Sequence, residues 1–270
     1  MGLADWSKGF LKDLKGIDLS YFQLSEVYIY CPYICNCIIE YVFFYFQNLK
    51  RINNKCYYLF KKVKSDLLTK NGPKFYEIFS VFRQVLKPNM NSVHLGDECC
   101  ASVAALNHFL HTTFEKVEWD WRAICYNIFF EENYSTRSEV LFHHIDKHSF
   151  GVDSSGYLDV QENVQFFIDR CATEFKDKQV DLAISVAKES KVYHERFGGL
   201  VGAVNTLSDG GHFILQMDTM FHASTICLMY FLNCTFKEVH VYKPATSPPE
   251  SCSCFIICLH YLRNCKYLDQ

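Results

Sequence analysis

The spacing of apolar residues divides the chain into a helical first third and a longer region of mixed texture. Apolar positions recur at helical spacing in "CYYLFKKVKSDLL" and again in "FYEIFSVFRQVL". Asn71-Gly72-Pro73 separates these two predicted helices, and Lys87-Pro88-Asn89 ends the second one. We therefore predict a helical N-terminal extension over residues 1–90.

From Val93 onward, short apolar runs alternate with helical segments. Strands separated by helices of ordinary length predict a parallel sheet that is covered on both faces. The last two strands are joined by "PATSPPESCS", which leaves no room for a helix, so they should form an antiparallel hairpin at one edge of the sheet. The predicted strands are 93–97, 117–121, 141–145, 180–186, 211–217, 236–242 and 254–261, and the predicted helices are 99–111, 160–176, 194–207 and 219–233.

One segment of the predicted extension is unusually apolar. Residues 27–46, "VYIYCPYICNCIIEYVFFYF", are about long enough to span a bilayer. Pro32, Asn36 and Glu40 near its middle argue against a membrane span. We therefore predict a helix that is covered by the domain or by another chain, in a homo- or hetero-oligomer, with membrane association as the disfavoured alternative.

Composition and charge narrow the class of protein. Hydrophobic residues make up 49% of the 270 residues and charged residues 21%, which is typical of a globular protein. The net charge of −3 gives no general attraction to nucleic acid, so such binding would need a local patch such as the basic run at 50–64. Fourteen cysteines at irregular spacing, with no signal peptide at the start, indicate a reduced intracellular setting, nuclear or cytoplasmic.

Several long motifs resemble the FtsJ-type (RrmJ-type) RNA 2′-O-methyltransferases, in the same order and at similar spacing. The resemblance is closest to the animal enzymes that methylate the second nucleotide of the mRNA cap, and it covers about residues 74–261. The motifs are "VHLGDECCASVAALNHFL", "VEWDWRA", "FGVDSSG", "DGGHFILQMDTMFHASTICLMYFLNCTFKEVHVYKPATS" and "CLHY".

This resemblance implies an α/β fold of the Rossmann-like, S-adenosylmethionine-dependent methyltransferase class over residues 91–265. The sheet would have seven mainly parallel strands with a terminal antiparallel hairpin. The family enzyme continues into a second, non-catalytic domain, and we expect this chain, which ends at Gln270, to lack it.

The resemblance also locates the family's catalytic Lys-Asp-Lys-Glu set, whose central lysine assists deprotonation of the ribose 2′-hydroxyl. The first lysine falls near Lys50-Arg51, the aspartate on Val186, the central lysine on Gln216 and the glutamate on Ser253. Gln216 cannot take a proton, Val186 carries no charge, and Ser253 is too short. The sequence therefore predicts a degenerate catalytic site.

The turn after the first predicted strand departs from the family in the same way. An Ala-Pro-Gly-type sequence after an acidic residue lets the methionine part of S-adenosylmethionine lie against backbone. Here Gly96 and Asp97 lead into Glu98-Cys99-Cys100, and Glu98 would oppose the cofactor's own carboxylate. We predict a narrowed or blocked pocket and no cofactor, or S-adenosylmethionine if the chain is an active enzyme. Asp97 would contact that cofactor or, as we favour, cap the following helix.

Two further motifs keep the family pattern and allow two interpretations each. Asp153, within "FGVDSSG", could hold the edge of a nucleoside or belong to an ordinary turn. Lys243 and Ser247, within "KPATS", could form a rim that meets RNA phosphate or a structural turn.

Other chemistry-bearing residues favour structural interpretations. Trp119 and Trp121 are expected in the core rather than as platforms for bases. His143, His144 and His148 invite a metal site, but hydrogen-bonded or solvent-facing histidines are favoured because no carboxylate or cysteine pattern accompanies them. Metal or disulfide pairing among thiols at the strand ends is a disfavoured alternative; these are Cys99, Cys100, Cys252 and Cys254.

The favoured function is therefore a degenerate homologue of mRNA cap 2′-O-methyltransferase, a pseudoenzyme that binds a protein partner or capped RNA. The alternative is an active S-adenosylmethionine-dependent cap 2′-O-methyltransferase. A third interpretation is a structural or assembly protein that docks through its apolar N-terminal helix.

Overall fold

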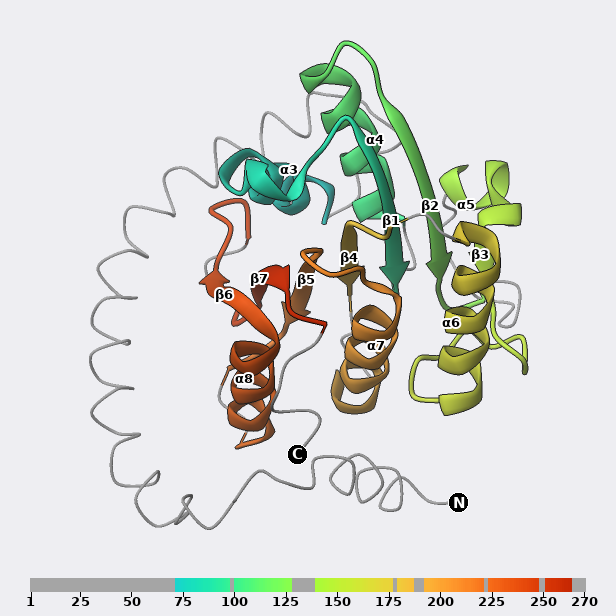
Figure 1. Ribbon diagram of the computed structural model, residues 1–270. Helices are drawn as coiled ribbons and strands as arrows, with labels where there is room; N and C mark the ends of the chain where they lie inside the picture. The colour runs from blue at the N-terminus through green and yellow to red at the C-terminus, as the bar shows by residue number, and fades with distance from the viewer. Residues whose placement is uncertain are drawn as a thin grey trace, which may run out of the picture.

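A seven-stranded sheet forms the centre of the computed structural model, with the strand order β3-β2-β1-β4-β5-β7-β6 (Figure 1). The structure describes residues 71–97, 100–127, 139–176, 179–186, 192–220, 223–247 and 251–263. Neighbouring strands from β3 to β5 run parallel, whereas β7 is antiparallel to both β5 and β6. The strands are β1 (Asn89–Leu95), β2 (Glu118–Ile124), β3 (His148–Ser149), β4 (Leu182–Ser185), β5 (His212–Met217), β6 (Phe236–Tyr242) and β7 (Cys254–Tyr261).

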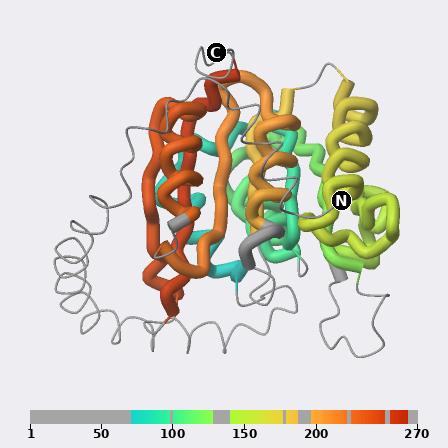
Figure 2. The backbone as a smooth tube through the Cα atoms, turned by 90° about the horizontal axis from the view of Figure 1, so that it is seen from below, coloured from blue at the N-terminus to red at the C-terminus, as the bar shows by residue number. Residues whose placement is uncertain are grey.

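Helices cover both faces of this sheet, as the alternating texture predicted (Figure 2). One layer consists of α6 (Gln161–Phe175), α7 (Val192–Thr206) and α8 (Ala223–Thr235), and the other contains α3 (Gly72–Val81) and α4 (Ala101–Thr113). Successive residues of each strand point to opposite faces. Phe213 and Leu215 of β5 therefore pack under α6, α7 and α8, whereas Ile214 packs under α3 and α4. The predicted seven-stranded α/β fold is confirmed.

The first described helix, α3, lies within the predicted helical N-terminal extension, and it packs into the core. Phe75 and Phe79 are fully buried, and the Phe75 ring meets Phe255 of β7 at 5.5 Å between centroids. Asn71-Gly72-Pro73 therefore begins this helix, since proline is well suited to a first turn. The apolar segment 27–46 and the basic run 50–64 lie outside the described residues.

The predicted strand at 141–145 is wrong. This stretch forms α5 (Glu139–His143), followed by the short 3₁₀ helix η3 (Ile145–Lys147), and the edge strand β3 comes only afterwards. A short apolar run has too few positions to distinguish a strand from one helical turn. Leu141 is fully buried, whereas Phe142 is 46% exposed, so the run packs through one side of the turn. The other strands and helices lie where predicted, with ends shifted by a few residues.

Within the described ranges, no helix is both long enough and apolar enough to cross a membrane.

Candidate functional site

Three positions to which the sequence resemblance assigns the family's catalytic set lie together at the carboxyl edge of the sheet. Val186 follows β4, Gln216 lies near the end of β5, and Ser253 precedes β7. The register pairs Ser185 with Leu215, and Gln216 with Phe255, so the three positions are neighbours across adjacent strands. Their exposed fractions are only 6%, 6% and 8%, respectively.

The same three positions also share one face of the sheet. Val186, Ile214 and Phe255 all belong to the cluster under α3 and α4, and strand alternation places Gln216 and Ser253 on that face too. Gln216 Oε1 is buried without a hydrogen-bond partner in the described part of the chain. Ser253 Oγ lies 2.8 Å from Ser251 Oγ. An amide, a hydroxyl and an isopropyl group provide no base for a ribose hydroxyl at neutral pH.

The turn after β1 keeps the backbone of a ligand turn but not its small residues. Gly96 has a φ of +78°, and a Cβ at this position would lie 2.2 Å from the carbonyl oxygen of Val186. Cys100 has a φ of 52° and a ψ of 30°, a left-handed conformation that favours glycine. Its side chain is nonetheless buried, at 1% exposure. Glu98 and Cys99 lie outside the described residues.

Asp97 caps α4 through contacts with Ser102. Its Oδ2 accepts hydrogen bonds from the Ser102 backbone N–H and from Ser102 Oγ, both at 2.6 Å. These contacts match the capping interpretation of Asp97. One carboxylate oxygen of Asp97 is thus engaged by the helix that follows it.

A chain of buried hydrogen bonds continues from this cap through the interior of β1. Trp119 Nε1 donates to Ser92 Oγ at 2.8 Å, and Ser92 Oγ lies 3.0 Å from His94 Nε2. His94 Nδ1 lies 2.7 Å from Ser102 Oγ. Trp119 Nε1 can only donate and the Asp97 carboxylate can only accept, so every hydrogen bond in this series must point from Trp119 toward Asp97. Ser92 Oγ therefore donates to His94 Nε2, and His94 carries its proton on Nδ1 and donates to Ser102 Oγ. Burial, with a smaller contribution from His148, lowers the pKa of His94 to about 3, so the ring is neutral.

The predicted core role of Trp121 and the hydrogen-bonded role of His148 match the structure, whereas Trp119 is half-buried and also lines a groove at the amino edge. Trp121 is 4% exposed and stacks on Trp119 at 6.1 Å. His148 Nδ1 donates to the carbonyl of His144 at 2.8 Å, and its Nε2 lies 3.3 Å from Cys100 Sγ. Among the described residues, no group of three or more potential ligands is placed to hold a metal ion, and the described cysteines, Cys252 and Cys254 included, form no disulfide bond.

Asp153 is held within its own turn. Its Oδ1 accepts hydrogen bonds from the Ser155 backbone at 2.9 Å, Ser155 Oγ at 2.7 Å and Asn163 Nδ2 at 2.8 Å. Partial burial opposes ionisation, but these hydrogen bonds outweigh it and lower the pKa of Asp153. The geometry is that of an Asx-type turn tied to α6.

The loop that contains Lys243 and Ser247 is fixed by a carboxylate from α3. Glu77 accepts hydrogen bonds from Tyr242 Oη at 2.6 Å, from the backbone N–H of Ala245 at 2.7 Å, and from both the backbone and the side chain of Thr246. Ser247 is buried, and Lys243 Nζ donates to the carbonyl of Ser251. Lys243 therefore lies at the same sheet edge as Ser253, in a turn that hydrogen bonds to Glu77 hold in place.

Sequence reasoning missed three charged residues that organise this edge. Glu77 is 165 or more residues from its partners in the loop. Arg196, near the start of α7, has a buried side chain and forms an ion pair at 2.5 Å with the half-buried Asp218, directly after β5. "QMDT" places Asp218 after a predicted strand, which marks it as a strand-end residue, but no local pattern in the sequence indicates its partner.

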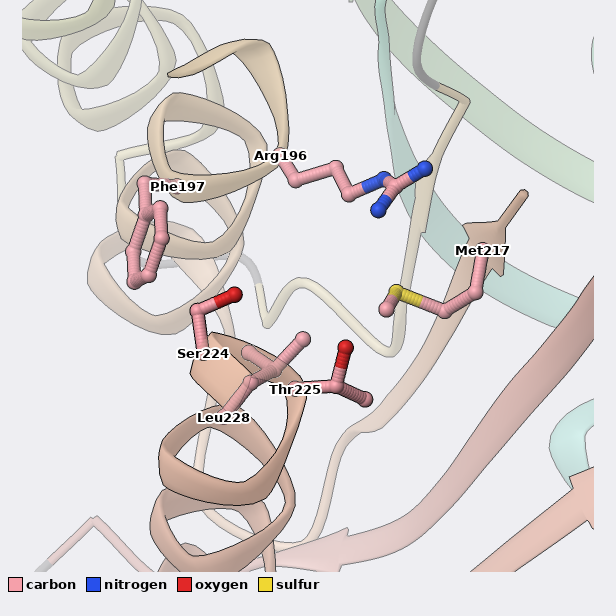
Figure 3. Close-up of a pocket in the computed structure, with 6 residues that line it drawn as sticks. All are labelled: Arg196, Phe197, Met217, Ser224, Thr225 and Leu228. Atoms are coloured by element: carbon pink, nitrogen blue, oxygen red, sulfur yellow. The ribbon is translucent and has the colours of Figure 1, made fainter. Parts of the chain in front are cut away.

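Two cavities accompany these features. A small cavity of about 10 Å³ lies at the carboxyl edge, lined by Arg196, Phe197, Met217, Ser224, Thr225 and Leu228 (Figure 3). An open groove of about 730 Å³ lies at the opposite, amino edge, lined by polar residues such as Asn89 and Glu118. Neither is lined by Gly96, Asp97 or Cys100 of the turn after β1.

The class of protein follows from the strand order and from a family match. The position of β7, antiparallel between β5 and β6, is the arrangement of Rossmann-like methyltransferases. Residues 199–261 match the FtsJ-like methyltransferase family. The chain therefore contains an FtsJ-like methyltransferase domain, as the sequence predicted.

The chain is also similar in sequence to cap-specific methyltransferases of animals. The chain is 35% identical over 217 residues to cap-specific mRNA (nucleoside-2′-O-)-methyltransferase 2 of Drosophila melanogaster, an alignment that covers 74% of this chain and 31% of that protein. The enzyme of the same name from Danio rerio is 31% identical over 216 residues, which cover 73% of this chain and 29% of that protein. The chain thus spans less than a third of the length of these relatives.

Among solved structures, a putative ribosomal RNA methyltransferase from Plasmodium falciparum aligns with a TM-score of 0.43 and 13% identity, over 72% of this chain and 98% of that one. The strand order, rather than this likeness, defines the fold.

Proposed function

We propose that this chain is a catalytically inactive relative of the cap 2′-O-methyltransferases, which acts by binding RNA or a protein partner. The observation that carries the proposal is the buried group formed by Val186, Gln216 and Ser253 at the carboxyl edge. Members of a catalytic set act as a unit, so the loss of one typically removes most of the rate. Here three of the four family positions hold residues that cannot do the family's chemistry.

The described part of the turn after β1 does not fit S-adenosylmethionine, which supports the same proposal. Cys100 carries a side chain at a position whose backbone conformation favours glycine. Asp97 Oδ2 already accepts two hydrogen bonds from Ser102. A cofactor that lies against backbone needs both small residues and free polar groups. We therefore propose that the chain works without S-adenosylmethionine.

The alternative, an active cap 2′-O-methyltransferase, is favoured by the 31–35% identity to cap-specific methyltransferases. A substitute base would then be required, and Lys188, two residues beyond Val186, is the first residue to mutate; it lies outside the described residues. Docking through residues 27–46, also outside those residues, remains the third hypothesis.

A methyl-transfer assay separates these proposals. The full chain is incubated with capped RNA and S-adenosylmethionine labelled in its methyl group, beside a no-protein control and an active cap methyltransferase. We expect no incorporation above the no-protein control, and none from Gln216→Lys alone, because Val186 and Ser253 remain. Calorimetry should detect no micromolar binding of S-adenosylmethionine or S-adenosylhomocysteine. Incorporation of label by the unaltered chain would contradict the pseudoenzyme proposal.

A further inference from the structure

The Arg196 guanidinium is buried with part of its hydrogen-bonding capacity unused. Its side chain is 5% exposed, and its Nη2 donates to Asp218 Oδ2 at 2.5 Å. Its Nε–H has no hydrogen-bond partner among the described residues. Buried polar groups are nearly always paired, so an unpaired donor on a charged group calls for a water, an ion or a ligand.

This guanidinium lines the small cavity at the carboxyl edge of the sheet, which we call the Arg196 pocket. Ser224 and Thr225 line it from the first turn of α8, and Met217 lines it from the end of β5 (Figure 3). The first turn of a helix presents unpaired backbone N–H groups and the positive end of the helix dipole. The pocket therefore combines a buried cation, two hydroxyl side chains and a helix N-terminus, all of which favour an oxyanion.

The Arg196 pocket is distinct from the degenerate catalytic group. Met217 faces the layer of α6, α7 and α8, whereas Val186 faces the layer of α3 and α4. The two sites nonetheless share the same edge, since Met217 directly follows Gln216 and pairs with Cys254 of β7. Lys243 lies at this edge too, where its Nζ bonds the carbonyl of Ser251. An extended ligand that lies along this edge would thus reach both Arg196 and Lys243.

We propose that the Arg196 pocket binds one oxygen of a phosphate group, and that the phosphate belongs to an RNA strand lying along the carboxyl edge. The inference deepens the proposed function, on which it rests for the choice of RNA as ligand. A cavity of about 10 Å³ admits roughly one water-sized group. A single phosphate oxygen has that size, so it enters beside the Arg196 guanidinium while the rest of the phosphodiester stays at the surface. Arginine is well suited to phosphate because its planar fork offers several donors.

Asp218 makes the inference sharply testable, because this carboxylate competes with the phosphate for Arg196. In Asp218→Asn the guanidinium loses its anionic partner, so phosphate should bind more tightly. In Arg196→Gln the pocket loses its cation, and in Thr225→Val it loses one hydroxyl with little change of shape. Arg83, exposed on η2 (Arg83–Val85) before β1, provides the matched control Arg83→Gln.

Binding of a fluorescently labelled single-stranded RNA to the full chain and its variants is measured by anisotropy over a range of salt concentrations. We expect Arg196→Gln to weaken binding about tenfold and to reduce the salt slope by about 1, because one phosphate contact is lost. Thr225→Val should weaken binding roughly threefold, Asp218→Asn should tighten it by a similar factor, and Arg83→Gln should match the unaltered chain. Inorganic phosphate at millimolar concentration should compete with RNA in the unaltered chain but not in Arg196→Gln.

Several outcomes would overturn the inference. If Arg196→Gln fails to fold, Asp218→Asn still decides, since an unchanged or weaker affinity contradicts competition between Asp218 and phosphate. Binding of inorganic phosphate by an unaltered chain that binds no RNA would refute the RNA assignment. RNA binding that none of these variants alters would mean that the pocket holds only water. That last result would leave the proposed function intact, because methyl transfer is measured separately.

Discussion

Charged residues introduced at positions 186 and 216, where the sequence resemblance places the family's aspartate and lysine, should reveal that the two side chains face each other. Val186 and Gln216 extend the register in which Ser185 pairs with Leu215, and both are 6% exposed. Neighbouring strands lie about 4.8 Å apart, so side chains that are paired across them on one face lie within contact distance. Gln216→Lys places an amine in this buried site without a partner, and Val186→Asp does the same with a carboxylate.

Each single change should be costly, and the double change should cost less than the sum. An unpaired buried charge destabilises a fold by about 3–5 kcal/mol, less if its pKa shifts and the group becomes neutral. In the double variant the amine and the carboxylate can pair, so we expect a favourable coupling of about 1–3 kcal/mol. Urea unfolding of the four chains at neutral pH gives this coupling directly as a double-mutant cycle.

Gln216→Met provides the control for changing this position without adding charge. Gln216 Oε1 has no hydrogen-bond partner among the described residues, and an unpaired buried acceptor costs about 1–3 kcal/mol. The methionine variant should therefore be as stable as the unaltered chain or more stable by up to about 1 kcal/mol. If the free energies of the two charged variants add within about 0.5 kcal/mol, the side chains do not meet, and the alignment of the family's aspartate and lysine with these positions fails.

Three shorter predictions concern other parts of the domain. Ser102→Ala should destabilise the fold by about 2–3 kcal/mol in urea, because a buried carboxylate and histidine each lose a hydrogen bond; a loss no larger than that of the exposed Ser80→Ala would contradict this. Asp120 is partly buried, which opposes ionisation, but Lys147 and Arg122 lower its pKa to about 2. Its contribution is therefore present above about pH 4 and lost as the pH falls through 2, so Asp120→Asn and the unaltered chain should converge there in acid titrations followed by circular dichroism. A thiol reagent should label exposed Cys227 in the native chain long before buried Cys258, whose pKa burial raises; equal rates would refute this.

Much of the fold could be predicted from the spacing of apolar residues, because each long strand and helix has its own local pattern of apolar and polar positions. β5 is apolar on both faces, since helices cover both, and α6 presents one apolar stripe. The failure at 141–145 has the same origin, because one helical turn is shorter than the period that would identify it. The local pattern of apolar residues thus predicts a helix or strand well where the element is long enough for that pattern to repeat.

The site could be predicted only as far as its residues end adjacent strands. Val186 and Gln216 lie at the carboxyl ends of the parallel strands β4 and β5, and Ser253 precedes the antiparallel β7, so topology alone brings all three to one edge of the sheet. Arg196 and Asp218 form an ion pair across 22 residues, and no spacing rule specifies such a pair between a helix and a loop. The anchoring of the Lys243 loop by Glu77 is likewise a tertiary contact without a local signal.

The turn after β1 shows which constraints the chain has kept and which it has lost. At Gly96 a side chain would collide with the Val186 carbonyl at 2.2 Å, so the packing of β1 against β4 requires glycine whether or not a ligand binds. At Cys100 the backbone also has a positive φ, yet the side chain packs beside Trp121 and Leu141 and its sulfur lies near His148. A left-handed residue costs about 1–2 kcal/mol, which burial of a thiol can offset. The turn therefore keeps glycine at Gly96, where the packing of β1 against β4 requires it, and at Cys100 it combines a positive φ with a side chain that packs in the core.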